Sequence, residues 1–109
     1  IYSGDDVLTL PMMSVGAVGV VSVATHLAGP QVAEMVAAAL KGDWERARVL
    51  HLALAPLAKA LFAEPNPQPV KGGLTAYWEP VGDPRLPLVP AGAASVDALG
   101  EALEIARKA

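Results

Sequence analysis

The stretch Gly19 to Ala24, which reads GVVSVA, constrains the fold of this chain more than any other segment. Its β-branched residues fall on both faces of an extended backbone, so a strand here needs cover on both sides. Strands of this kind are typical of parallel sheets, which lie between layers of helices. A second strand candidate, Ile1 to Ser3, precedes it in the chain. We therefore predict an α/β fold in which both segments belong to a parallel sheet.

The remaining periodic segments read as helices. Between the two strand candidates, Asp5 or Asp6 can cap a helix that ends at Gly16, and Pro11 indicates that its first turn is irregular or that it starts later than Asp6. Further helices are predicted from apolar spacing and capping residues. They run over about 30–41, about 43–61 with Asp43 as its cap, about 68–78, and about 95–108 with Ser95 as its cap.

The helix expected after Asp43 carries a long apolar stripe that requires a partner. Its members repeat in steps of three and four residues: Ala47, Leu50, Leu54, Leu57 and Leu61. Pro56 removes one backbone donor, so we expect a kink near Leu52 to Ala55. Two strands cannot form a covered parallel sheet, and the stripe needs apolar cover as well. We therefore expect most of the partner surface to lie outside this sequence.

Composition and charge exclude several classes of function. The net charge of −3 comes with no basic cluster, which argues against a nucleic-acid partner. Hydrophobic residues make up 53% of the chain, but polar residues, glycine and proline interrupt every apolar run before the length of about 18 residues that a membrane span requires. The chain has no cysteine, which rules out disulfides and thiolate chemistry and fits a cytoplasmic protein.

Three motifs occur together in a fixed order: SGDD at Ser3 to Asp6, GVVSV at Gly19 to Val23, and EPNPQPVK at Glu64 to Lys71, followed by PRLPLVP. In this order and spacing they resemble the carboxyl-terminal third of the dihydrodipicolinate synthase family. These enzymes are pyruvate-dependent class I aldolases built on a (β/α)8 barrel, and EPNPQPVK is the most specific of the motifs. The resemblance implies that residues 1–41 form the end of the barrel, from strand seven to helix eight. It implies that residues 42–109 form an appended helical region and that Ile1 lies inside the seventh strand.

The resemblance also implies a chemistry for the intact protein. Family members hold pyruvate as a Schiff base on a lysine of strand six and condense it with aspartate semialdehyde, on the route to diaminopimelate and lysine. They are usually homotetramers, and no cofactor is expected. The strand-six lysine is not part of this sequence, so no catalytic residue is expected in it. Lys71 is interpreted as structural, and the other lysines as solvated: Lys41, Lys59 and Lys108.

The resemblance assigns substrate-binding positions to the ends of the two predicted strands. Gly4 and Val21 match positions whose backbone groups line the pyruvate pocket, and a glycine lets substrate approach the main chain closely. Asp5 is either a carboxylate of the pocket wall or a helix cap, and both interpretations stay open. Asp6 is interpreted as a cap. Ser22 lies on the opposite face of its strand from Val21 and receives no role.

His26 follows the second strand candidate and is interpreted as a loop histidine. His51 lies between apolar helix residues and has no second ligand at metal spacing, so it is interpreted as a helix-packing or surface histidine, and we predict no metal site. Two other functions compete with the synthase. One is a related pyruvate-dependent lyase that acts on a sugar acid, which the residues preceding Ile1 would discriminate. The other is a stand-alone helical module whose apolar stripe docks on a partner helix.

Overall fold

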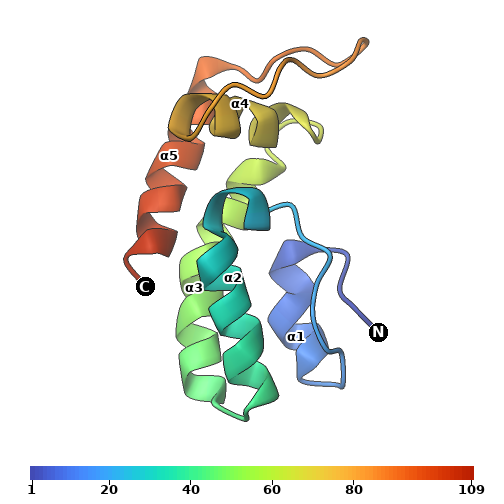
Figure 1. Ribbon diagram of the computed structural model, residues 1–109, viewed down its shortest axis with the longest axis vertical. Helices are drawn as coiled ribbons and strands as arrows, with labels where there is room; N and C mark the ends of the chain where they lie inside the picture. The colour runs from blue at the N-terminus through green and yellow to red at the C-terminus, as the bar shows by residue number, and fades with distance from the viewer.

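The computed structural model describes residues 1–109 as a small bundle of helices that measures 42 × 28 × 20 Å (Figure 1). A short 3-10 helix, η1, precedes five α-helices. In chain order the elements are η1 (Asp6–Leu8), α1 (Thr9–Met13), α2 (Thr25–Leu40), α3 (Trp44–Leu61), α4 (Gln68–Tyr77) and α5 (Ala93–Arg107). Helices α2 and α3 lie side by side, α1 packs beside them near the amino terminus, and α5 packs on α3.

The two predicted strands form a single parallel bridge, between Ser3 and Val20, rather than regular strands. Three backbone hydrogen bonds surround the bridge: Val18 N–H to the Ile1 carbonyl at 3.0 Å, Ser3 N–H to Gly19 at 2.9 Å, and Val21 N–H to Ser3 at 2.8 Å. The predicted pairing direction is therefore confirmed. The predicted extent to Ala24 is wrong, because the N–H groups of Val23 and Ala24 donate to a side chain instead of to a neighbouring strand.

The segment between the paired stretches follows the sequence prediction closely. Asp5 caps η1 by accepting a hydrogen bond from the N–H of Val7, and the α-helix proper begins at Thr9. This later start places Pro11 in the first helical turn, where a missing N–H costs little. Gly16 has a φ of 112°, the left-handed conformation expected after the helix end.

Helix α2 begins earlier than the prediction of about Pro30. A first turn starts at Thr25, and the helix then bends at Ala28, whose φ of −129° and ψ of 43° are not helical. Pro30 has no N–H to donate to the carbonyl of His26, and its ring would clash with that carbonyl in a regular helix, so the bend joins two helical pieces. Gly42, with a φ of 83°, ends the helix as predicted.

Helix α3 forms the centre of the core. Asp43 caps it through a 3.0 Å hydrogen bond from the N–H of Arg46, and the helix continues through Pro56 to Leu61. Every member of its predicted apolar stripe is buried: Ala47, Leu50, Leu54, Leu57 and Leu61.

The chain itself supplies the partner of this stripe, and the expectation that most of it lies elsewhere is wrong. Helix α2 contributes Val32 and Met35 to the shared core, and α5 contributes Leu99, Leu103 and Ala106, all of them buried. The reason is the return of α5 onto α3 after a long irregular segment, a path that local periodicity does not encode.

Helix α4 begins at Gln68 as predicted, but α5 begins before its expected cap. Its amino end is Gly92, so Ser95 lies inside the first turn and caps nothing. The N–H of Gly92 donates to the Glu64 carboxylate over 3.0 Å, which links the proline-rich motif to the start of α5. Gln68, Pro69 and Val70 of the same motif are buried against the bundle.

An exposed ion pair joins α2 to α3: Arg46 Nε lies 2.7 Å from Glu34 Oε1. The hydrogen bond that Arg46 donates to the Glu34 carboxylate, together with the negative charge of Glu34, raises the pKa of Arg46. Exposed pairs of this kind contribute little to stability. None of the helices combines the length and apolar character that crossing a membrane requires.

The paired segments at the amino end remain largely uncovered. Side chains on them that are apolar and exposed include Ile1 at 90%, Tyr2 at 63% and Val21 at 75%. A shallow groove lined by Tyr2, Val18 and Val20 continues onto the exposed side of α2. The sequence predicted that both faces of the strand at Gly19 to Ala24 are buried, and within residues 1–109 this burial is incomplete.

Candidate functional site

The carboxyl ends of the two paired segments meet at one edge of the molecule. Gly4 follows Ser3 on the first segment, and Val21 follows Val20 on the second. The N–H of Val21 donates to the carbonyl of Ser3 over 2.8 Å, so the peptide groups next to Gly4 and Val21 are direct neighbours. The structure thus brings together the backbone positions that the sequence assigned to substrate binding.

Gly4 and Val21 present open main chain at this edge. A Cβ atom placed on Gly4 would meet no heavy atom within 4 Å, and the Val21 side chain is 75% exposed. No hydrogen bond within the chain involves the carbonyl oxygen of either residue. The two carbonyls are therefore available to an external group.

Asp5 is exposed, and its carboxylate accepts a hydrogen bond from the N–H of Val7 over 3.2 Å. The capping interpretation of Asp5 is confirmed by this contact. Its second interpretation, as a carboxylate of the pocket wall, stays a prediction, because one carboxylate oxygen has no partner within the chain.

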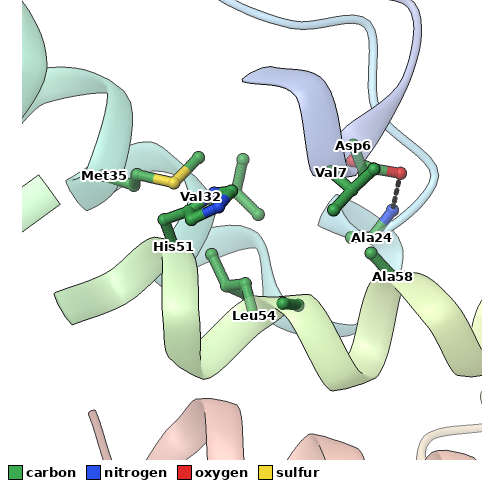
Figure 2. A pocket seen from close by; sticks show the side chains of 9 residues that line it. Asp6, Val7, Ala24, Val32, Met35, His51, Leu54 and Ala58 are labelled. Atoms are coloured by element: carbon green, nitrogen blue, oxygen red, sulfur yellow. Dashed lines mark hydrogen bonds between the residues drawn. The ribbon is translucent and has the colours of Figure 1, made fainter. Parts of the chain in front are cut away.

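Asp6 makes the contacts that join the two loops, and the interpretation of this residue as the cap of its own helix is wrong. Its Oδ2 accepts hydrogen bonds from the N–H groups of Val23 at 3.0 Å and Ala24 at 3.1 Å, and its Oδ1 accepts one from the hydroxyl of Ser22. Figure 2 shows the Asp6 carboxylate directed at Ala24 from the neighbouring loop. Asp6 therefore caps the backbone that leads into α2, across a separation of 16 to 18 residues.

Both loops are also fixed internally. In the first loop, the Ser3 hydroxyl donates to the backbone carbonyl of Asp5 at 2.7 Å, and the Thr9 hydroxyl donates to the backbone carbonyl of Asp6 at 2.9 Å. Ser3 and Thr9 are almost fully buried. In the second, the N–H of Thr25 donates to the Ser22 hydroxyl at 3.1 Å, and the Thr25 hydroxyl donates back to the Ser22 carbonyl. The buried hydroxyls of Ser3 and Thr9, satisfied in this way, hold the first loop in one backbone conformation, whereas the contacts of the second loop are exposed.

The three hydrogen bonds that the Asp6 carboxylate accepts from Ser22, Val23 and Ala24 form a clamp between the two loops. A small hollow lies behind this clamp, between η1, α2 and α3 (Figure 2). Its lining is mostly apolar and includes Val7, Val32, Met35 and Leu54, with His51 beside Met35 and Val32. Its volume is about 10 Å³, room for about one water molecule, so it cannot hold an organic substrate. The structure therefore places His51 at a packing position, as the helix-packing interpretation of this residue expects.

Lys71 lies in the carboxyl-terminal part of the chain and not at the edge formed by Gly4 and Val21. Its Nζ donates to the carbonyl of Asp83 over 3.2 Å, which ties α4 to the irregular segment that follows. This contact favours the structural interpretation of Lys71. The other lysines, Lys41, Lys59 and Lys108, are exposed, and so is His26.

Comparison with known proteins links these residues to one family. The model of the dihydrodipicolinate synthetase family matches residues 1–106. The 4-hydroxy-tetrahydrodipicolinate synthase of Parasynechococcus marenigrum (strain WH8102) is 60% identical over 90 residues, which are 83% of this chain and 30% of that protein. The synthase of Synechococcus elongatus is 53% identical over 103 residues, 94% of this chain and 34% of that protein.

Solved structures agree with the sequence comparisons. The dihydrodipicolinate synthase of Thermotoga maritima superposes with a TM-score of 0.92 at 39% identity, over 97% of this chain and 36% of that one. The enzyme of Cyanidioschyzon merolae with lysine bound superposes with a TM-score of 0.90 at 42% identity, over 97% and 36%. The chain thus spans about a third of the length of the relatives it matches. On the family match over nearly all of its residues, this chain belongs to the dihydrodipicolinate synthetase family.

Proposed function

We propose that this chain is the carboxyl-terminal part of a 4-hydroxy-tetrahydrodipicolinate synthase, a lyase that condenses pyruvate with aspartate semialdehyde in diaminopimelate and lysine biosynthesis. The observation that carries the proposal is the 60% identity to a synthase over 90 residues, on a chain whose predicted pocket positions meet at one edge. The whole protein is about three times as long as this segment, to judge from the share of the relatives that it covers.

In this proposal residues 1–41 are the end of a (β/α)8 barrel. The paired segments are its seventh and eighth strands, α1 and α2 are the helices that follow them, and residues 42–109 are the appended helical region. The parallel sense of the Ser3 to Val20 bridge supports this assignment, and so do the uncovered side chains of Tyr2 and Val21. In barrel enzymes the carboxyl ends of the strands carry the active site, which is where Gly4 and Val21 lie.

The role of this segment is to hold and orient pyruvate rather than to react with it. The unpaired carbonyls of Gly4 and Val21 and the exposed carboxylate of Asp5 form one wall of the pocket. The Schiff-base lysine belongs to strand six and comes from outside these residues. Covalent catalysis by a lysine needs the substrate carbonyl in a fixed attack geometry, and a rigid wall supplies that geometry.

Assembly and location form part of the same proposal. We place the protein in the cytoplasm as a homotetramer, the usual state of the family. Exposed apolar side chains that another subunit can cover support the oligomer, and they include Val15 at 87% exposed and Leu52 at 63%.

A trapping experiment on the full-length protein tests the reaction. Borohydride reduction with pyruvate is expected to leave one stable adduct, which peptide mass spectrometry places on a lysine outside residues 1–109. Turnover is expected with aspartate semialdehyde and not with an aldehyde derived from a sugar acid. An adduct on Lys41, Lys59, Lys71 or Lys108 contradicts the residue assignment. Turnover of only the aldehyde derived from a sugar acid contradicts the synthase and favours the related pyruvate-dependent lyase.

A further inference from the structure

The Asp6 carboxylate is the only side chain that bonds the first loop to the second. It reaches from the end of one paired segment to Ser22, Val23 and Ala24 at the end of the other. Between these anchored residues and the bridge lies Val21, whose own N–H is held by Ser3. Every residue from Val20 to Ala24 is thereby fixed by a contact with the first segment, either through the bridge or through Asp6.

We propose that Asp6 is a positioning residue of the synthase, which sets the relative placement of the Gly4 and Val21 carbonyls without touching substrate. The inference rests on the proposed function. The carbonyl of Val21 belongs to the peptide unit whose N–H is that of Ser22, and the Ser22 side chain is bonded to Asp6. A change in the clamp therefore moves this carbonyl directly, while Gly4 stays fixed by Ser3 and Thr9 through their contacts with the first loop.

A carboxylate suits this position because every partner is a donor. Asp6 accepts from one hydroxyl and two N–H groups, which uses both of its oxygens. Hydrogen bonds to an ionised acceptor are roughly twice as strong as neutral ones. An asparagine keeps one acceptor oxygen for the two N–H groups, and its amide N–H₂ can then face only the Ser22 hydroxyl, which must accept instead of donate. Asp6→Asn therefore removes the charge that strengthens all three contacts and weakens the clamp at almost constant size.

The chain provides a matched control for this substitution. Asp43 caps α3 with the same chemistry, through its Oδ1 and the N–H of Arg46 at 3.0 Å, but it bridges no loops and lies at the far end of α2 from Ser22. Asp43→Asn removes a capping charge of the same kind. A loss of stability that both variants share is attributed to the loss of a capping charge. A fall in kcat/KM that only Asp6→Asn shows is attributed to the position of the substrate-binding carbonyls.

The experiment compares both variants in the full-length protein by thermal unfolding, by kcat and KM for pyruvate, and by hydrogen exchange at the amides of Val23 and Ala24. We expect both to unfold at a lower temperature. Only Asp6→Asn is expected to lower kcat/KM for pyruvate, by about 10- to 100-fold, the range that misplacement of a binding group by about 1 Å produces. Exchange at Val23 and Ala24 is expected to accelerate in Asp6→Asn alone.

Ser22→Ala is the second variant, and it decides the question if Asp6→Asn does not fold. It removes the hydroxyl contact with Asp6 and the acceptor of the Thr25 N–H, and it leaves both N–H contacts of Asp6, so a smaller fall in kcat/KM is expected. The inference is overturned if Asp6→Asn folds and has wild-type kinetics. If Asp6→Asn does not fold, wild-type kinetics in Ser22→Ala overturn it. Absence of a pyruvate adduct in the wild-type protein contradicts the proposed function instead. The borohydride trapping that detects the adduct uses only wild-type protein, so the two failures are distinguishable.

Discussion

At the scale of single residues, Gly4 and Gly42 are glycines for different reasons. A Cβ at Gly4 would meet nothing within 4 Å, so the chain itself does not require glycine there. Gly42 has a φ of 83°, a conformation that side chains disfavour, where a Cβ would also meet no neighbour. The proposed contribution of Gly4 to pyruvate binding can therefore be tested separately from any contribution to folding.

Gly4→Ala is expected to leave the free energy of unfolding within about 0.5 kcal/mol of wild type, as at other open surface positions. It is expected to raise KM for pyruvate severalfold in the full-length protein, because the added methyl group occupies the pocket edge. Gly42→Ala is the control and should show the reverse pattern: a loss of about 1–2 kcal/mol from the left-handed backbone, with KM unchanged. Denaturant unfolding and steady-state kinetics measure both. An unchanged KM in Gly4→Ala contradicts the assignment of Gly4 to the pocket.

The resemblance to the family was sufficient to assign Gly4, Asp5 and Val21 to the ends of the two paired segments, because the motifs SGDD and GVVSV contain these residues. It was not sufficient for Asp6 and Ser22. Two adjacent carboxylates follow the first segment, and local geometry explains only one of them as a cap. The other carboxylate bonds to residues 16 to 18 positions away, a contact set by the tertiary approach of the two loops. The only sequence feature that could have indicated this contact was the second carboxylate, Asp6, for which local capping leaves no role.

At the scale of elements, helix starts were predictable where a local signal marks them, either a capping side chain as at Asp43 or a proline string as before Gln68. Asp43 was found because its partner, the N–H of Arg46, is three residues away. The start of α5 was missed because its amino end is held by Glu64, a residue 28 positions earlier. The bend at Ala28 was also missed, because Pro30 suggested a helix start where the structure continues a helical turn from Thr25.

The two caps give an element-scale prediction. Ser95→Ala is expected to change the free energy of unfolding by less than about 0.5 kcal/mol, because Ser95 caps nothing and alanine favours the helix interior. Asp43→Ala is expected to cost about 1 kcal/mol, since it removes a capping acceptor at an exposed helix end. Chemical denaturation of the full-length variants measures the difference. A cost at Ser95 equal to that at Asp43 contradicts the observed start of α5.

At the scale of the whole molecule, the helices cover one another while the paired segments stay open. The buried stripe of α3 satisfies the requirement for cover that the sequence predicted, although its partner comes from within the chain. The requirement of the two predicted strands is not met: Ile1, Tyr2 and Val21 remain exposed. Apolar periodicity in the sequence predicted that the α3 stripe and the two strands each need cover. It did not predict that α5 returns onto α3, and this return contributes to the cover of the stripe but not of the strands.

This asymmetry separates a barrel segment from a stand-alone helical module. The isolated 109-residue chain is expected to bind a hydrophobic reporter dye and to associate at micromolar concentration, through its uncovered segments at the amino end. The full-length protein is expected to bind little dye, because the rest of the barrel covers the same side chains. Dye fluorescence and sedimentation of both proteins measure this. A sharp, reversible melt of the isolated chain without dye binding favours the helical module and contradicts the barrel assignment.

Helix α3 packs on both α2 and α5, which also contact each other, so Leu50 and its buried neighbours belong to a core shared by all three helices. Any exchange of the last helices between relatives must for this reason carry α2 along. A graft made at the Gly42 turn would leave the donor stripe facing a foreign surface, whereas one made before Thr25 would move the packed unit intact. The exchange of helices α3 to α5 between relatives is thereby tied to α2, the helix that leads away from the Asp6 clamp.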